Sequence, residues 1–137
     1  MTVVSFSESE WRQFLKSEPP RPNLLVSCAS DELEAVVTRM MALCTAPVHA
    51  CGLPGELSLP EDMNGTLLLW DVARLTFGQQ RKLRHWMAGR PANAQVISIT
   101  SSPLLPLVEG GRFLEGLFYR INVVSLVARV GDDRAEA

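Results

Sequence analysis

Few residues of this sequence have types and spacings that could do chemistry. Asp71 follows a run of leucines in GTLLLWDVARL, so a single acid stands at the end of what reads as a buried strand. His49 and Cys51 would share one face of a strand, and with Cys28 and Cys44 they supply side chains of metal-binding type. However, there is no Cys-x-x-Cys pair, and free cysteines commonly behave as small buried hydrophobic residues. We therefore predict core cysteines and no metal site.

The composition is that of an ordinary globular domain. The 137 residues suit one domain, 1–137, of which 47% are hydrophobic and 20% charged. A formal net charge of −2 gives no electrostatic footprint for nucleic acid or an anionic membrane. No apolar run approaches the ~20 residues that span a bilayer, and the N-terminus lacks the pattern of a signal peptide. We expect a cytoplasmic protein with neither nucleic-acid nor membrane partners.

The hydrophobic pattern alternates between strands and helices. Short apolar runs predict five strands, at 23–28, 46–51, 66–72, 95–100 and the end of GLFYRINVVSLVARV. Helices are expected at 7–16, 31–43, 76–87 and 103–109. Strands that alternate with helices predict βαβ units, and strands that are apolar throughout favour a mostly parallel sheet with helices on both faces.

Two of the expected helices carry clear local signals. The helix at 31–43 has apolar residues at i, i+3, i+4, i+7 and i+8, which predict one continuous buried face: Leu33, Val36, Val37, Met40 and Met41. Thr76 and Gln79 are spaced as a capping box, and we expect Leu83, Trp86 and Met87 to point inward. The helix at 7–16 has a similar box at its start.

Three phrases carry a family resemblance: GTLLLWDVARLTFGQQRKLRHWM, AQVISITSS and EGGRFLEGLFYRINVVSL. In order and spacing they resemble the AAA+ ATPase domain of bacterial sigma-54-dependent transcription activators, over residues 65–126. The first half of the chain resembles that domain more faintly. The resemblance implies a three-layer α/β/α domain of the P-loop-NTPase (ASCE) type, with a five-stranded mostly parallel sheet in the order 5-1-4-3-2.

The phosphate-binding loop that the resemblance implies is degenerate here. A P-loop wraps backbone N–H groups around phosphates, using glycines for the turn and a lysine for the β/γ oxygens. The corresponding residues have neither glycine nor lysine: Ser27, Cys28, Ala29, Ser30 and Asp31. Asp31 would also bring negative charge near the phosphates, so we predict no bound nucleotide or other cofactor.

The catalytic positions implied by the family are altered as well. Where it places an Asp and then a Glu of Walker B, this chain has Trp70 and Asp71, and an indole cannot ligate magnesium. Asp71 is alternatively a turn-stabilising acid at a strand end. We expect Trp70 to fill the vacated metal pocket, the alternative being an exposed contact. Ser101 replaces the asparagine of sensor I.

The resemblance places arginines at a protomer interface, and this chain keeps some of them. The first arginine finger aligns with Leu114 and the second with Arg120, while Arg112 matches a framework arginine. In an AAA+ ring, such a finger stabilises phosphate charge on the neighbouring protomer. Arg120 could instead anchor a FYRIN strand through a local ion pair. We retain Arg120 and Arg112 as candidate interface residues.

The functional expectation is a non-catalytic pseudo-ATPase that regulates bacterial transcription through protein contacts. The sequence GLPGELSLPEDMNG stands where the family carries its sigma-contacting loop, and we expect neither a lid domain nor a helix-turn-helix. The partner would be a second copy or a competent sigma-54 activator. Two alternatives remain, a nucleotide-binding sensor without hydrolysis and a receiver-like signalling domain. A fragment of a longer protein is also compatible with the sequence.

Overall fold

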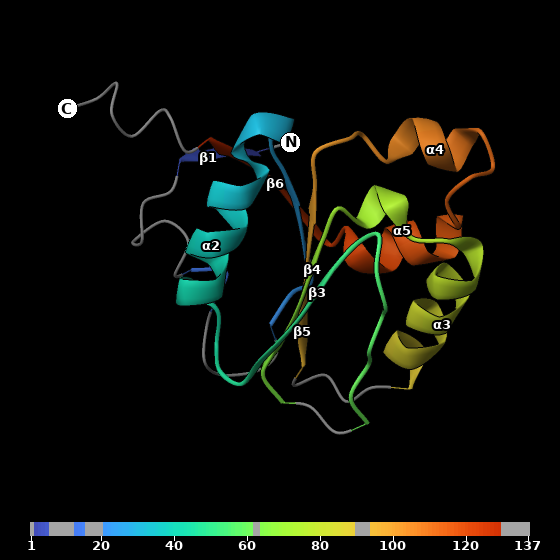
Figure 1. Ribbon diagram of the computed structural model, residues 1–137, viewed down its shortest axis with the longest axis horizontal. Helices are drawn as coiled ribbons and strands as arrows, with labels where there is room; N and C mark the ends of the chain where they lie inside the picture. The colour runs from blue at the N-terminus through green and yellow to red at the C-terminus, as the bar shows by residue number, and fades with distance from the viewer. Residues whose placement is uncertain (1, 6–12, 16–20, 62–63, 90–93, 130–137) are drawn as a thin grey trace.

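The computed structural model describes residues 2–5, 13–15, 21–61, 64–89 and 94–129. Within these ranges, no helix is both long enough and apolar enough to cross a bilayer. The predicted helix at 7–16 lies almost wholly outside the described residues. Figure 1 shows a sheet seen nearly edge-on, with helices on both of its sides.

The sheet is parallel throughout and has the predicted strand order. Its strands are β1 (Thr2–Ser5), β2 (Leu24–Ser27), β3 (Val48–Gly52), β4 (Thr66–Trp70), β5 (Gln95–Thr100) and β6 (Val124–Arg129). They lie in the order β1-β6-β2-β5-β4-β3, so the five predicted strands follow the expected 5-1-4-3-2. An additional strand, β1, extends the edge beside β6, with Thr2 opposite Leu126.

This strand order decides against a receiver-like domain. Receiver domains have the doubly wound order 2-1-3-4-5, in which the first two strands are neighbours. Here β2 lies between β5 and β6, and β3 is at the far edge of the sheet. The topology is therefore that of the ASCE type and not that of a receiver.

Two hydrophobic clusters fill the space on the two faces of the sheet. The helices are α2 (Leu33–Leu43) on one face and α3 (Phe77–Ala88), α4 (Leu105–Glu109) and α5 (Glu115–Ile121) on the other (Figure 1). Alternate residues of β4 serve the two clusters, since Leu67 and Leu69 pack with α3 and α5 while Leu68 packs with α2. Burial on both faces explains why this strand is apolar from Leu67 to Trp70.

Fewer residues of the helix α2 are buried than the sequence predicts. Val36 and Met40 are fully buried against the sheet, and Leu33 and Val37 flank them. Met41, predicted to share this face, is 46% exposed, so that part of the prediction is wrong. Among the described residues, α2 is the one α-helix on this face (Figure 1), and Met41 lies at the margin of its apolar stripe.

The other side of the sheet confirms one predicted helix and corrects another segment. Thr76 and Gln79 form the predicted capping box at the start of α3, in which each side chain bonds the other residue's backbone. The expectation of a strand through FYRIN is wrong. Those residues complete α5, because Leu117, Phe118 and Ile121 at helical spacing bury one face against the sheet.

Candidate functional site

The structure brings the predicted loop, the Walker B position and the sensor position to one edge of the sheet. These segments follow β2, β4 and β5, which are neighbouring parallel strands. The backbone N–H of Cys28 donates to the carbonyl oxygen of Thr100 at 3.1 Å, and that of Asp71 donates to Ile99 at 2.8 Å. Ser101 follows directly after Thr100. The structure thus brings together the three positions that the family resemblance implies.

The loop after β2 has bonded half of its backbone donors within the chain. Besides the Cys28 amide, the amide of Glu32 donates to Ala29 at 3.0 Å, and that of Leu33 donates to Ser30. A phosphate-binding loop works only when consecutive amides point at the anion. In this loop, three of the amides between residues 28 and 33 are already committed to carbonyl oxygens of the chain itself.

The electrostatic environment of the loop is acidic. Burial, followed by the negative charges of Glu32, Asp71 and Asp31, raises the pKa of the Cys28 thiol to about 11. All three carboxylates disfavour a thiolate, and a phosphate at this place would meet the same repulsion. Burial is the largest cause of the raised pKa of Cys28, and the three acids add to it.

The indole of Trp70 lies over the neighbouring strand β3. It is half-buried and packs against the cluster on the α2 side of the sheet. Gly52 stands directly opposite Trp70 in the register, and a Cβ atom at Gly52 would approach the indole Cε2 to 2.5 Å. The glycine therefore provides the space that the ring occupies, and the indole rests on the sheet instead of projecting fully into solvent.

Asp71 adopts a left-handed backbone conformation, with φ 63° and ψ 43°. It is the single non-glycine residue with positive φ in the described parts of the chain, and Asp is among the residues that tolerate this region. Its carboxylate lies 3.8 Å from the guanidinium of Arg74, three residues later and largely exposed. The geometry agrees with a turn-stabilising role through a weak surface ion pair.

No grouping of three or more histidine, cysteine or acidic side chains suited to a metal ion occurs among the described residues. Cys51 is buried, and the ring Nε2 of His49 is 2.8 Å from the carbonyl oxygen of Ser58. Burial also raises the pKa of the Cys44 thiol, to about 12. These cysteines occupy interior or half-buried positions, as the sequence predicted.

The candidate interface residues lie on one segment, 112–120, at and within α5. Arg112 and Arg120 are exposed, while Leu114, half-buried, packs against the core at the start of the helix. The ion pair proposed for Arg120 is absent from the described residues, so that alternative is not supported. Beside Arg120, the side chains of Tyr119 and Val123 are 63% and 59% exposed.

Gln80, which sequence reasoning missed, fixes the start of this segment. Its side chain is 1% exposed and makes three hydrogen bonds. Nε2 donates to the carbonyl oxygens of Leu75 and Arg112, each at 3.1 Å, and Oε1 accepts from the backbone N–H of Leu114 at 2.8 Å. A buried amide fully paired in this way holds its partners in one arrangement.

Asn23 performs a similar task at the other end of the segment. Its Nδ2 donates to the carbonyl oxygen of Arg120 at 2.9 Å, and its Oδ1 accepts from the backbone N–H of Val96 at 3.0 Å. The backbone of Asn23 also accepts from Val124 at 3.1 Å. One asparagine thus joins the end of α5 to the starts of β5 and β6.

Comparison with known proteins identifies relatives of this arrangement. The model of the Sigma-54 interaction domain family matches residues 13–128. The "Pathogenicity locus probable regulatory protein WtsA" of Pantoea stewartii subsp. stewartii is 33% identical over 79 residues, covering 50% of this chain and 24% of that protein. This chain therefore spans only a part of that relative.

Solved structures with the same fold include NtrX from Brucella abortus. Its complex with ATP matches 97% of this chain and 40% of the NtrX chain, with a TM-score of 0.64 at 20% identity. The complex with ADP matches 90% and 36% of the two chains, with a TM-score of 0.60 and the same identity. Family match and fold agree, and this chain belongs to the Sigma-54 interaction domain family, as a sigma-54 activator-like domain of transcription regulation.

Proposed function

We propose that this chain is a non-catalytic protein-interaction module, a pseudo-ATPase that retains the activator fold without nucleotide chemistry. The observation that carries the proposal is the condition of the loop after β2. Three of the six backbone amides from residue 28 to residue 33 are bonded within the chain, and the acids Glu32, Asp71 and Asp31 all raise the pKa of Cys28. A triphosphate at this loop would find fewer donors than a phosphate-binding loop offers, and acids outnumber the basic side chain beside it.

The surface of segment 112–120 supports a protein partner. Arg120 is exposed on α5 beside Tyr119 and Val123, and arginine and tyrosine are enriched where protein interfaces gain most of their affinity. Gln80 and Asn23 hold the backbone at both ends of the segment. A surface positioned in this way loses little conformational freedom on binding.

The partner we propose is a second copy of this chain or a competent sigma-54 activator, whose ring this module would cap, inhibit or assist. Contact with the sigma factor itself is not favoured. The loop after β3 is bonded to α3 by Gln79, Lys82 and Trp86, whose side chains donate to carbonyl oxygens of Gly55, Leu57 and Pro60 at 2.7–2.9 Å. A loop fastened to the body of the domain does not project toward a distant partner.

A titration against the ATPase domain of a competent sigma-54 activator tests the proposal. Light scattering measures complex formation and self-association, and phosphate release measures the activator's ATP turnover. We expect a complex and a changed turnover near equimolar ratio. Arg120→Ala should weaken the complex about 10-fold or more, because truncating a central interface arginine costs about 1.4 kcal/mol or more.

Arg81→Ala is the matched control, since Arg81 is an exposed arginine on the neighbouring helix α3. It should leave affinity and turnover unchanged. If the chain neither associates with itself nor alters the activator, the interaction proposal is wrong. If Arg81→Ala and Arg120→Ala weaken the complex equally, the interface lies elsewhere.

Nucleotide binding without hydrolysis is a second candidate. A hollow of about 490 Å³ lies beside the loop, between Asp31 and Glu32 on one side and Arg129 on the other. Its volume is sufficient for a ligand, but two of these three charged side chains are acidic. A thermal shift with millimolar ATP and magnesium would favour this candidate, and an unchanged melting temperature would reject it.

A further inference from the structure

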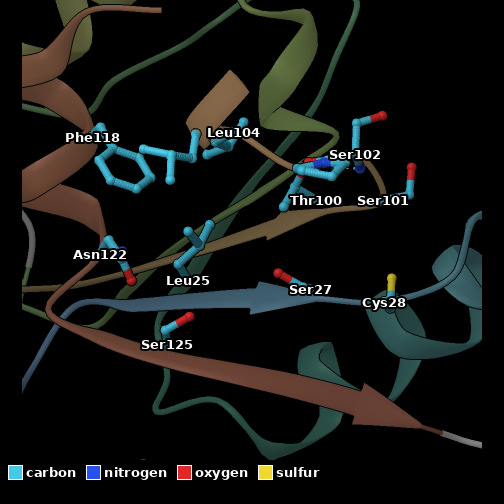
Figure 2. Close-up of a pocket in the computed structure, with 12 residues that line it drawn as sticks. Leu25, Ser27, Cys28, Thr100, Ser101, Ser102, Leu104, Phe118, Asn122 and Ser125 are labelled. Atoms are coloured by element: carbon cyan, nitrogen blue, oxygen red, sulfur yellow. Dashed lines mark hydrogen bonds between the residues drawn. The ribbon is translucent and has the colours of Figure 1, made fainter. Parts of the chain in front are cut away.

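A second cavity, of about 470 Å³, lies on the face of the sheet opposite α2. It is lined by residues of β2, β5 and β6, by Leu104 and Leu105 at the start of α4, and by Phe118 of α5, which stands at the left of Figure 2. Its volume falls within the range of small-molecule pockets, about 300–1,000 Å³. None of the residues implied in nucleotide chemistry fills it, although Ser27, Cys28 and Ser101 stand at its border.

The cavity has an apolar side and a polar side. Figure 2 shows Leu25, Leu104 and Phe118 around one part of the space, and these side chains belong to the hydrophobic core. The hydroxyl group of Ser125 and the amide of Asn122 lie along another part. An apolar body and a small number of convergent polar groups are the usual construction of a ligand site.

The polar group of most consequence is the side-chain oxygen of Asn122. This Oδ1 atom is buried and has no hydrogen-bond partner within the described part of the chain. A buried acceptor without a donor is unfavourable, and a ligand that brings an N–H or O–H group would relieve that cost. Thr100 offers less, because its hydroxyl already donates to the carbonyl oxygen of Ser102 at 2.6 Å and accepts from its amide at 3.1 Å.

The charge and position of the cavity define the ligand further. None of its lining residues carries a charged side chain, so an anion would be desolvated there without a partner. The cavity reaches from Asn122 and Ser125, at the start of β6, to the carboxyl ends of β2 and β5. The helices that follow these two strands diverge to opposite faces of the sheet (Figure 1). Open α/β sheets bind ligands in the crevice at such a switch point.

We infer that this cavity binds a small uncharged molecule with an aromatic or aliphatic body and one hydrogen-bond donor, which Asn122 accepts. The inference does not depend on the proposed protein interaction, and it differs from nucleotide binding in both the face of the sheet and the chemistry of the ligand. Binding here would fill the space between α4, α5 and the strands.

Phenol, toluene and benzoate are suitable probes, monitored by methyl NMR of leucine-labelled protein. Phenol should shift the methyl signals of Leu25 and Leu104 and leave those of Leu53 and Leu57 in place. A ligand of about seven heavy atoms should bind with a dissociation constant of about 1–10 mM. Benzoate should cause no shift. Phenol-induced shifts confined to other leucines, or benzoate binding as tight as phenol, would overturn the inference.

Variants separate the hydrogen bond from the cavity itself. In Asn122→Leu, the ratio of phenol to toluene affinity should fall about 2- to 12-fold, the range of one hydrogen bond. Ser125→Phe should fill the space and abolish both ligands' shifts, whereas Ser58→Phe, at an exposed serine, should change nothing. An unchanged ratio in Asn122→Leu would contradict the role of that side chain, even if Ser125→Phe failed to fold.

Discussion

The loop after β2 and the segment 112–120 use their backbone groups in opposite ways. In the loop, three of the six amides from residue 28 to residue 33 are bonded to carbonyl oxygens of the loop and of β5, and three acids raise the pKa of Cys28. In the segment, the buried side chain of Gln80 and the partly exposed side chain of Asn23 hold the backbone, and the arginines remain at the surface. Under the proposed function, the first region does not bind an anion and the second is presented to a partner.

If the proposed function holds, the difference teaches that an activator fold can lose one site while the framework of another persists. The two regions meet different structural requirements, since phosphate binding needs unpaired amides and positive charge. An arginine is presented to a partner when its backbone is held rigidly and its guanidinium group remains in solvent. Each requirement can be tested by itself, and the following variants do so in order of decreasing expected effect.

Gln80→Leu should have the largest effect, because it leaves a buried carbonyl oxygen of Leu75, a partly buried one of Arg112 and the amide of Leu114 without this partner. We expect the free energy of unfolding to fall by about 3–5 kcal/mol. Denaturant unfolding followed by circular dichroism measures it. Arg81→Leu, exposed on the same helix, should stay within about 0.5 kcal/mol. A loss below about 1 kcal/mol for Gln80→Leu would mean that the segment is not held by this residue.

Asn23→Ala should cost about 1–2 kcal/mol, since the bonds to Val96 and Arg120 are lost near the surface. Asn23→Asp is the informative companion variant. It keeps an acceptor for the amide of Val96 and removes the donor to Arg120, so its cost should be smaller. Hydrogen exchange at the end of α5 should then quicken in both variants. Unchanged exchange there would show that Asn23 stabilises β5 alone.

Gly52→Ala should cost about 1–2 kcal/mol, because the new methyl group would collide with the indole of Trp70. Since this ring is half-buried, it can partly move aside. The double variant Gly52→Ala, Trp70→Leu should recover much of the loss. Gly78→Ala is the control, because its nearest neighbour is 3.9 Å away and alanine favours the helix. Equal melting temperatures for Gly52→Ala and the parent protein would show that packing of Trp70 on Gly52 does not stabilise the fold.

The smallest expected effect is on the titration of Cys28. Glu32→Gln should lower its pKa below the present value of about 11, because Glu32 is the first of the charges that raise it. Thiolate absorbance in a Cys44→Ser, Cys51→Ser background measures this. The neutral thiol favours the folded state, so its contribution is present below the ordinary pKa of 9.0 and is lost as pH rises toward about 11. A pKa at or below 9 would indicate a field that attracts anions, and the contrast between the two regions would fail.

Local sequence signals predicted the regular parts of this fold. The capping box of Thr76 and Gln79, and the apolar runs of β2, β4 and β5, depend on neighbours along the chain, and the structure confirms them. The helix α5 was missed because Gly116 and the aromatic and β-branched residues around it favour a strand as readily as a helix.

The supporting residues of the site could not be predicted from such signals. Gln80 interrupts an apolar helix face, and its partners Arg112 and Leu114 lie 32 and 34 residues away. Asn23 bonds residues 73 and 97 positions distant. Only the folded chain brings these groups together. The loop and Walker B positions, by contrast, follow strand ends, and the parallel sheet collects strand ends at one edge.

The hydrogen bonds that hold the loop after β3 against α3 have a consequence for tryptophan fluorescence. The indole Nε1 of Trp86 donates to the carbonyl oxygen of Pro60 at 2.7 Å, and Lys82 and Gln79 tie the same loop to α3 further along. Release of the loop would expose this indole bond to water and shift its emission to longer wavelength. The fluorescence of Trp86 therefore reports whether a bound partner separates the loop from α3 or leaves the two in contact.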